Sequence, residues 1–400
     1  MNPDGNKLAI LGGKPAFDHP LHVGRPNIGD RAVLMQRIET LLDNRWLSNG
    51  GPFEREFEAK IADMVGVKHC IAMCNATVAL EIVIRALDLT GEVIVPSLTF
   101  VATAHALQWQ QVTPVFADID PATHNLDPAA VERMITPRTS GIIGVHLWGR
   151  PCDTDALGDI AERHGLRLMY DAAHAFGAGH NGRMIGGFGD AEVFSFHATK
   201  FLNAFEGGAV VTNDDALAAK MRLMRNFGFT GWDEVSYVGT NGKMTEVCAA
   251  MGITSLESID RVIDANRANH AAYREELETI PGFTLIDYGD SGERNYQYLV
   301  TEVDATRTGI SRDRLIELLW AENVFARRYF YPGCHRMEPY RSHQPHAGLL
   351  LPETEAVAGR LLVLPTGTTI DRQDIAAICG VMRLAVEQAD EVNAALNATA

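Results

Sequence analysis

Residues 195–200 read Ser-Phe-His-Ala-Thr-Lys, and residues 205–212 read Phe-Glu-Gly-Gly-Ala-Val-Val-Thr. The first stretch follows the apolar run at 193–196, and the second leads into the apolar run at 209–212. Lys200 is therefore predicted to lie in a connection between two strands of one sheet. In an open parallel sheet, ligands bind where the carboxyl ends of the strands meet. Burial there would lower the pKa of the Lys200 amine and make it a nucleophile toward a carbonyl group. Taken alone, however, a single lysine is usually just solvated.

The same alternation of apolar runs and helix-length segments extends from residue 31 to about residue 255, which predicts a mostly parallel mixed sheet flanked by helices. A long amphipathic segment over 256–280 is predicted to be a connecting helix. After it, the order of predicted strands and helices no longer follows the alternation of the first region. We therefore predict an α/β fold with an N-terminal arm (1–30), a large domain (31–255) and a smaller α+β domain (256–400). The strands predicted for the large domain are 69–73, 92–95, 112–117, 141–146, 167–170, 193–196 and 209–212.

Composition excludes several classes of protein. The chain of 400 residues is 46% hydrophobic and 22% charged, which is typical of a folded globular protein. The chain has 35 Lys and Arg residues and 51 Asp and Glu residues, and the basic residues form no run. No nucleic-acid partner is therefore expected. The six cysteines form neither paired metal knuckles nor a dense disulfide framework. With no predicted targeting or membrane-spanning segment, we expect a cytoplasmic protein with reduced thiols.

Polar residues follow two of the predicted strands. Asn75, Ala76 and Thr77 open a helix, where free N–H groups suit a phosphate, although Asn and Thr are also preferred as plain N-caps. Asp171 ends an apolar strand, and a buried carboxylate needs a cationic partner. That partner could be the protonated ring nitrogen of a cofactor, or Asp171 could cap the next segment. His174, three residues later, could touch the same ligand or be a structural histidine.

A metal site is an alternative for the same edge of the sheet. His146, His174 and His197 each follow a predicted strand and could join Asp171 as ligands. The short ligand-pair spacing of zinc sites is missing, and a lysine in the same crevice suits carbonyl chemistry better. We therefore predict no metal.

Seven motifs together resemble the DegT/DnrJ/EryC1/StrS family of nucleotide-sugar aminotransferases, which are pyridoxal phosphate enzymes of fold type I. Each motif is weak by itself, but their order and spacing are specific, and the resemblance covers nearly the whole chain. The motifs are N-A-T (75–77), P-S-L-T-F-V-A-T (96–103), V-H-L-W-G (145–149), D-A-A-H-A (171–175), S-F-H-A-T-K (195–200), E-G-G (206–208) and G-T-N-G-K-M-T-E (239–246).

The resemblance implies a role for each matching residue around the cofactor. Lys200 would hold pyridoxal 5'-phosphate as an internal Schiff base and, once freed, carry the proton between substrate and cofactor. Asp171 would pair with the pyridinium nitrogen and keep it protonated. His174 stands where many members have Gln and would lie near the phenolic oxygen. The remaining cofactor-binding residues would be Ala76, Thr77 and Ser195 at the phosphate and Phe100 on the ring face.

The resemblance also implies a homodimer with shared active sites. Asn241 would reach the cofactor phosphate of the neighbouring subunit. Lys243, in the same loop, would meet the amino donor or an anionic part of the sugar nucleotide, although a surface lysine is as common. Arg25, Arg327, Arg328 and Tyr329 would contact the nucleotide diphosphate, base or sugar, or else form a cluster at a domain interface.

Because Lys200 is present, the resemblance implies a ping-pong transamination in which glutamate, leaving as 2-oxoglutarate, loads the cofactor as pyridoxamine phosphate. The string at 195–208 is more similar to the subgroup that aminates C4 of dTDP-4-keto-6-deoxy-D-glucose, giving dTDP-4-amino-4,6-dideoxy-D-glucose. One alternative is a C3 aminotransferase acting on a 3-keto sugar nucleotide. Another is a non-catalytic regulatory relative that binds the cofactor, but residues 1–30 are too short and too weakly basic for a helix-turn-helix reader.

Overall fold

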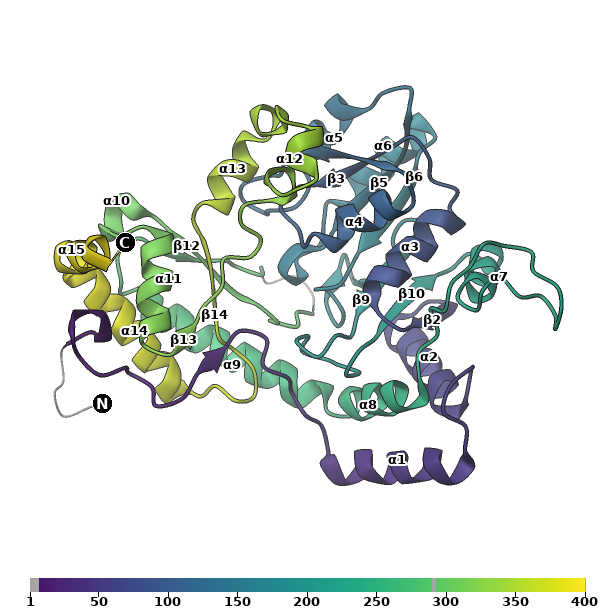
Figure 1. Ribbon diagram of the computed structural model, residues 1–400, viewed down its shortest axis with the longest axis horizontal. Helices are drawn as coiled ribbons and strands as arrows, with labels where there is room; N and C mark the ends of the chain where they lie inside the picture. The colour runs from purple at the N-terminus through teal and green to yellow at the C-terminus, as the bar shows by residue number, and fades with distance from the viewer. Residues whose placement is uncertain (1–6, 290–292, 400) are drawn as a thin grey trace.

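The computed structural model describes residues 7–289 and 293–399, and a seven-stranded sheet forms its larger half (Figure 1). Every strand predicted for this region is present, with ends that differ by a few residues. The strand order is β2-β10-β9-β6-β5-β3-β4, in which β10 runs antiparallel to both neighbours and all other pairs are parallel. The predicted mixed sheet is therefore confirmed. Its strands are β2 (His69–Met73), β3 (Glu92–Pro96), β4 (Thr113–Ala117), β5 (Thr139–Val145), β6 (Arg167–Asp171), β9 (Ala191–Ser195) and β10 (Gly208–Thr212).

Helices cover both faces of this sheet because its strands are apolar on both sides. In β2, for example, Cys70 and Ala72 join one buried cluster while Ile71 and Met73 join the other. Such doubly buried strands are typical of parallel sheets. One face carries α2 (Pro52–Val65), α5 (Pro128–Met134), α6 (Thr154–His164) and α8 (Glu246–Leu256), and the other carries α3 (Ala76–Ala86), α4 (Ala102–Trp109) and α7 (Asp215–Met224).

A second, three-stranded antiparallel sheet has the order β11-β12-β14 and lies beside the first (Figure 1). The segment predicted as a long connecting helix over 256–280 contains the single helix α9, which begins at Ile259 and ends at Leu277, and it follows α8, which ends at Leu256. The elements of this smaller region are α9 (Ile259–Leu277), β11 (Phe283–Leu285), β12 (Leu299–Val303), α10 (Ala305–Thr308), α11 (Arg312–Ala321), β14 (Leu361–Leu364), α14 (Arg372–Glu387) and α15 (Ala389–Thr399). Among the helices of the described ranges, none combines the length and apolar character that crossing a membrane requires.

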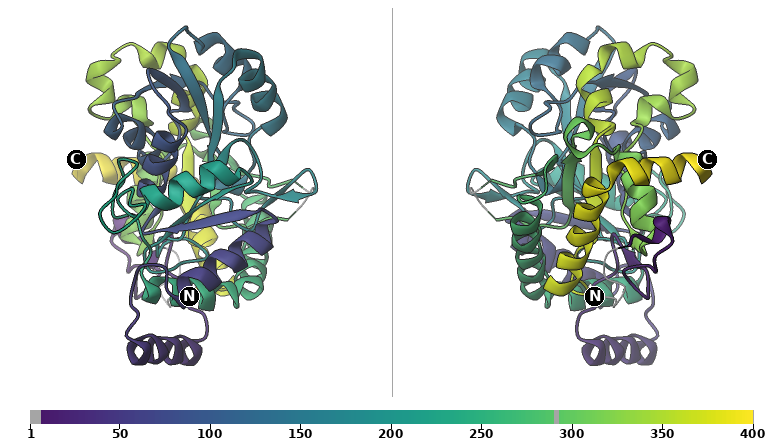
Figure 2. Two further views of the ribbon diagram at one scale, coloured as in Figure 1. Left: turned by 90° about the vertical axis from the view of Figure 1, so that its right-hand side faces the viewer. Right: turned by 90° about the vertical axis from the view of Figure 1, so that its left-hand side faces the viewer.

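The N-terminal arm packs on the smaller region before it reaches the large sheet. Its strand β1 (Leu21–His22) pairs in parallel with β13 (Val324–Phe325), and Leu8 and Phe17 are buried in the core of that region. Asn27 then bridges two distant segments, because its side chain donates to the carbonyl of Phe201 and accepts from Thr368. Beyond the arm, α1 (Arg31–Asn44) stands at one end of the molecule (Figure 2).

Residues 334–358 lie within the range predicted for the small domain, yet they pack on the large sheet. Cys334, Tyr340 and Leu351 belong to the buried cluster that includes α3 and α4. This segment contains η3 (Cys334–Arg336), α12 (Tyr340–His343), η4 (Ala347–Leu350) and α13 (Pro352–Ala358).

Asp118, directly after β4, fastens the start of α13. Its buried carboxylate accepts from the backbone N–H groups of Glu353 and Thr354 at 3.0 and 2.9 Å, and from the Thr354 hydroxyl at 2.8 Å. Helix N-termini leave N–H groups without partners inside the helix, so a carboxylate from another segment stabilises the helix and its position together.

Replacing Asp118 with Ala should lower the free energy of unfolding by about 2–4 kcal/mol, because two buried donors and one partly buried donor lose their acceptor. Asp127→Ala is the matched control: Asp127 caps α5 by accepting from Ala129 and Ala130 at a more exposed site, where a lost cap costs about 1 kcal/mol. Urea unfolding of the two variants measures the difference, and equal losses would contradict the role given to Asp118.

Candidate active site

Lys200 lies in the connection between β9 and β10, at the carboxyl edge of the large sheet. Its Nζ atom lies 3.2 Å from the hydroxyl of Tyr298, which comes from the smaller region just before β12. Burial lowers the pKa of the lysine amine from 10.5 to about 8, although the nearby carboxylate of Asp171 favours the charged form. Near neutral pH this lowered pKa leaves a larger share of the amine unprotonated than the ordinary value would, and the unprotonated form is the one that attacks a carbonyl.

Asp171 is the last residue of β6, and its side chain is buried. Its carboxylate accepts from the Thr103 hydroxyl at 2.8 Å and from the Ala173 N–H at 3.1 Å. Burial raises the pKa of this carboxyl, and the two hydrogen bonds oppose that shift. A buried carboxylate with neutral donors only is stabilised further by a cation, so this position suits a protonated ring nitrogen.

His174 is buried and is neutral, because burial lowers its pKa well below 6.5. Its Nδ1 atom accepts from the backbone N–H of Trp148 at 3.3 Å. This hydrogen bond assigns the remaining proton to Nε2, which can therefore donate to an anionic oxygen. The ring is nearly parallel to those of Trp148 and Phe330, with centroids 6.1 and 5.7 Å away. His174 is thus a fixed neutral donor.

The start of α3 offers donors to an anion. The Asn75 side chain accepts from the Val78 N–H at 2.9 Å, so the predicted N-cap is present. In the described part of the chain, no protein acceptor is found for the N–H groups of Ala76 and Thr77 or for the Thr77 hydroxyl. Two free N–H groups at a helix N-terminus suit a phosphate group. The neighbouring Gly208 lets β10 come close, since a Cβ there would lie 2.6 Å from the Ala76 nitrogen.

Ser195 and Phe100 border the same edge of the sheet. Ser195 is the last residue of β9. Strand β10 lies between β9 and β2 and is antiparallel to both, so the carboxyl ends of β9 and β2 are at the same edge of the sheet. Phe100, at the turn before α4, is 58% exposed and leaves a ring face free for stacking on a planar ligand. Its ring centroid lies 6.2 Å from that of Phe330. The structure therefore places Ala76, Thr77, Phe100, Asp171 and Ser195 at or just after the carboxyl ends of strands, at the edge of the sheet that also holds Lys200.

The residues predicted for the substrate are more scattered. Arg25 is exposed in the arm next to Gly24, where a Cβ would lie 3.1 Å from the Thr199 Cβ. Arg327 is exposed, and among the described residues no carboxylate pairs with it. Tyr329 packs on Phe330 and lies edge-on to Tyr298, close to Lys200.

Three other predicted residues make their contacts with residues other than Lys200. Arg328 pairs with Asp313 at 2.8 Å and stacks on Tyr331. Lys243 donates to the Asn226 side chain at 3.0 Å and lies over the ring of Phe227. Asn241 is exposed, and its carbonyl oxygen lies 4.0 Å from the sulfur of Cys74, just before the start of α3.

The histidines of the metal alternative lie in separate environments. His146 faces the buried carboxylate of Glu192 at 3.2 Å, and His197 faces Glu206 at 3.4 Å. Within residues 7–289 and 293–399, no three His, Cys, Asp or Glu side chains gather as metal ligands would. The arrangement gives that alternative no support.

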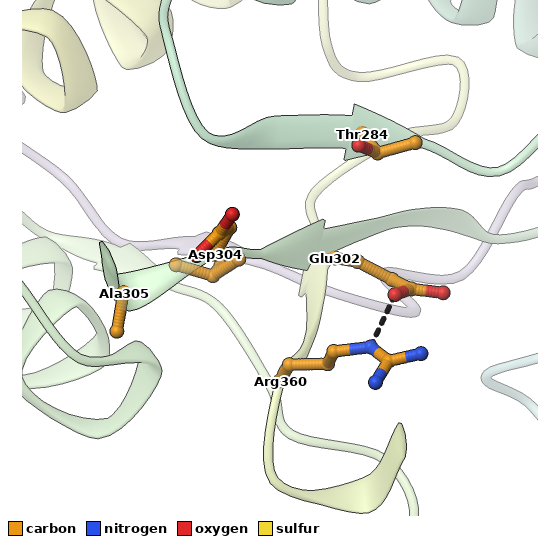
Figure 3. Close-up of a pocket in the computed structure, with 6 residues that line it drawn as sticks. Thr284, Glu302, Asp304, Ala305 and Arg360 are labelled. Carbon is orange, nitrogen blue, oxygen red and sulfur yellow. Dashed lines mark hydrogen bonds and ion pairs between the residues drawn. The ribbon is translucent and has the colours of Figure 1, made fainter. Parts of the chain in front are cut away.

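A cavity of about 400 Å³ lies elsewhere, beside β11 and β12 of the smaller region (Figure 3). It contains none of the predicted site residues, and the facing charges of Glu302 and Arg360 already pair with each other there. This cavity is therefore separate from the edge that holds Lys200. Its lining residues are Thr284, Glu302, Val303, Asp304, Ala305 and Arg360.

Comparison with known proteins decides the family. Residues 30–383 match the DegT/DnrJ/EryC1/StrS aminotransferase family. The chain belongs to this family. The expected resemblance is confirmed, the protein is an aminotransferase, and its cofactor is pyridoxal 5'-phosphate. The donors at the start of α3, the buried carboxylate of Asp171 and the amine of Lys200 fit the phosphate, ring nitrogen and aldehyde of that cofactor.

Several curated and solved relatives agree with this assignment. The dTDP-4-amino-4,6-dideoxy-D-glucose transaminase of Escherichia coli is 35% identical over 90% of this chain and 97% of its own. The GDP-perosamine synthase of Caulobacter vibrioides is 38% identical over 84% of this chain and 90% of its own. The crystal structure of DesI in the presence of its TDP-sugar product is 56% identical, with a TM-score of 0.93 over 97% of this chain and 98% of the other.

Sequence reasoning missed three residues of this site. Thr103 could have been found, because it follows Phe100 by three residues and helix spacing brings it to the same side. Trp148 acts through its backbone N–H, which no motif reveals. Tyr298 comes from a distant segment, and only the packing of the two regions places it beside Lys200.

Thr103→Val should weaken cofactor binding about tenfold, because the lost hydrogen bond raises the pKa of Asp171 further and weakens its pairing with a cation. Fluorescence titration of the cofactor-free protein measures the dissociation constant. Thr308→Val is the matched control: its buried hydroxyl donates to the Ile310 carbonyl in the smaller region, so stability falls while cofactor affinity is kept. Equal affinities for Thr103→Val and wild type would contradict the role of Thr103.

The pKa of Lys200 gives a pH prediction. Below a pKa of about 8 the amine is mostly charged and unreactive, and above it the amine is mostly free. The rate at which the cofactor-free protein captures pyridoxal phosphate should therefore rise to a plateau above about pH 8. Stopped-flow absorbance follows the capture, and a rate that keeps rising toward pH 10.5, the ordinary value for lysine, would show that Lys200 is not desolvated.

Proposed function

We propose that this enzyme transfers the amino group of glutamate to C4 of dTDP-4-keto-6-deoxy-D-glucose, giving dTDP-4-amino-4,6-dideoxy-D-glucose and 2-oxoglutarate. The observation that carries the proposal is the 56% identity, over nearly both whole chains, to DesI, whose structure was determined in the presence of its TDP-sugar product. The name of the Escherichia coli relative supports the same regiochemistry.

Within this proposal each residue at the sheet edge has a separate role. The bound cofactor supplies an electron sink for the carbanion that forms when a proton leaves the substrate carbon. Lys200 attaches the cofactor and then moves that proton. Asp171 keeps the ring nitrogen protonated, and neutral His174 donates from Nε2 to the phenolic oxygen. Ala76, Thr77 and Ser195 hold the phosphate, and Phe100 covers the ring.

The sugar nucleotide brings two phosphates and needs cations that are free to meet them. Arg25 and Arg327 are exposed, and neither has a carboxylate partner among the described residues, so we assign them to the diphosphate. Tyr329, close to Lys200, is assigned to the sugar or base. Arg328 is left out because Asp313 and Tyr331 already hold it.

The proposed active unit is a homodimer in which Asn241 reaches the cofactor phosphate of the second copy. The neighbouring Gly242 carbonyl accepts from the N–H of Cys74 at 2.8 Å, so this loop lies beside the residues that precede α3. Exposed apolar side chains support a second copy as the partner. They occur in and next to α1 at Ile28, Met35, Leu42, Trp46 and Leu47, which we call the α1 patch. Large exposed apolar patches mark interaction surfaces. A cytoplasmic location also stays a proposal, and the unpaired state of all six cysteines supports it.

Amination at C3 of a 3-keto sugar nucleotide is the competing reaction. The pair His197-Ala198 before Thr199 and Lys200 favours C4, since the C3 subgroup tends to have Tyr or Phe followed by Pro there. The similarity to a GDP-perosamine synthase adds a second question, namely which nucleotide is accepted.

The two half-reactions can be followed separately in the visible absorption of the bound cofactor. Glutamate should bleach the band, and dTDP-4-keto-6-deoxyglucose should restore it, whereas Lys200→Ala should do neither because it lacks the amine that attaches the cofactor and moves the proton. Recovery with only a 3-keto isomer would overturn the C4 assignment, and recovery with only a GDP-linked keto-sugar would overturn the dTDP assignment. A wild-type protein that shows no band would overturn the proposal.

Leu42→Glu should shift the protein from dimer to monomer and weaken retention of the cofactor, because a charge in the α1 patch opposes burial against a second copy. Light scattering and gel filtration measure the assembly. Leu349→Glu is the matched control, since Leu349 is 81% exposed in η4, far from α1 in sequence, and its substitution should leave the dimer intact. A dimer that survives Leu42→Glu would contradict the use of this patch.

A further inference from the structure

The amine of Lys200 has one hydrogen-bond partner among the described residues, and it is Tyr298. The two residues come from different regions of the fold, because Lys200 follows β9 of the large sheet and Tyr298 precedes β12 of the small one. The contact therefore joins the two regions at the reacting amine. Neither the sequence motifs nor the family comparison assigns a role to this tyrosine.

Tyr298 is held rigidly. Its side chain is 8% exposed, and its ring lies edge-on to those of His174 and Trp148, with centroids 4.7 and 5.5 Å apart. Its carbonyl oxygen accepts from the Tyr288 hydroxyl at 2.6 Å, which fixes the backbone as well. A hydroxyl fixed from both sides presents its oxygen at one defined point, and a long lysine side chain that bonds to it loses most of its freedom.

A tyrosine hydroxyl can both accept and donate a hydrogen bond. Toward a charged ammonium it accepts, and toward a free amine it donates to the lone pair. An amine that takes up and releases a proton in each reaction cycle needs a partner that suits both forms. A carboxylate in the same place would accept from the ammonium but could not donate to the free amine.

We propose that Tyr298 is a positioning residue that holds the Lys200 amine toward the reacting carbon through both of its protonation states. The inference rests on the proton-moving role proposed for Lys200. Tyr298 suits this task because it stays neutral: burial raises its pKa, so the phenol keeps its proton in the range where the amine changes state.

The other groups that face Lys200 act at longer range. Asp171, on β6, favours the ammonium through its charge, and Tyr329, before η3, acts in the same direction. His174 is neutral and faces the same space. None of the three is hydrogen-bonded to Nζ in the described structure, so they shift the proton equilibrium without fixing the direction of the amine.

The first test uses the cofactor-free protein and does not depend on any substrate. An amine-reactive reagent is applied across a pH series, and the modification of Lys200 is measured by peptide mass spectrometry. Tyr298→Phe should lower the midpoint by about half to one pH unit, because a hydrogen bond to the ammonium is roughly twice as strong as one to the neutral amine. Tyr273→Phe is the matched control, since its buried hydroxyl donates to the Pro365 carbonyl away from Lys200.

The second test uses the holoenzyme. In single turnovers with glutamate, Tyr298→Phe should slow bleaching of the cofactor band by about 10- to 100-fold, because a freely rotating amine reaches the reacting carbon less often. Cofactor content and the apparent affinity for glutamate should stay near those of the Tyr273→Phe control. If Tyr298→Phe does not fold, Tyr298→Met, whose flexible side chain fills the same space without a hydroxyl, replaces it in both tests.

The outcomes separate the two proposals. A shifted midpoint together with slow bleaching supports the role of Tyr298 even if no keto-sugar is accepted, in which case only the proposed substrate is wrong. An unchanged midpoint with normal bleaching shows that Tyr298 only packs, and overturns the inference. A normal midpoint with slow bleaching, or a shifted midpoint with normal bleaching, also overturns it, because both effects must follow from one lost hydrogen bond.

Discussion

The carboxylate of Asp171 is the constraint around which this structure is arranged. It lies at the end of a buried strand, where solvation by water is lost. Among the described residues, the Thr103 hydroxyl and the N–H of Ala173 are the two donors that compensate. A charge in such a place is tolerated when a positive group faces it. The nearby amine of Lys200 supplies part of that charge in the free protein, and a protonated ring nitrogen supplies it when the cofactor is bound.

The same constraint explains why the site needs every part of the chain. The sheet contributes Asp171, Ser195 and Lys200 at its edge, and helix α3 contributes its N–H groups. The smaller region adds the hydroxyl of Tyr298, and the segment after β13 adds the ring of Phe330, which packs on His174. A water-poor enclosure strengthens each electrostatic contact within it, and no single region provides that enclosure alone.

Sequence reasoning reached those parts of the fold and site that local patterns encode. The strands of the large sheet could be predicted because they are short apolar runs separated by helical segments. Lys200 and Asp171 could be singled out because each lies at or soon after the end of a strand, within a motif that resembles the family. The helix α9 (Ile259–Leu277) could be predicted over 256–280 because its apolar residues recur at helical spacing. Tyr298 and the packing of residues 334–358 on the large sheet were missed because they depend on which surfaces meet, and no local pattern contains that information.

The bridge made by Asn27 bears on how the chain reaches its native state. The Asn27 side chain is hydrogen-bonded to Phe201, in the connection that contains Lys200, and also to Thr368. Thr368 lies 341 positions after Asn27 in the sequence. The arm that carries it pairs with β13, whose residues leave the ribosome about 300 positions after those of β1. Contacts of such long sequence separation form late, because the loop between them must first be closed. The large sheet can thus form earlier in synthesis, but the contacts of the arm are completed only after Thr368 has been made.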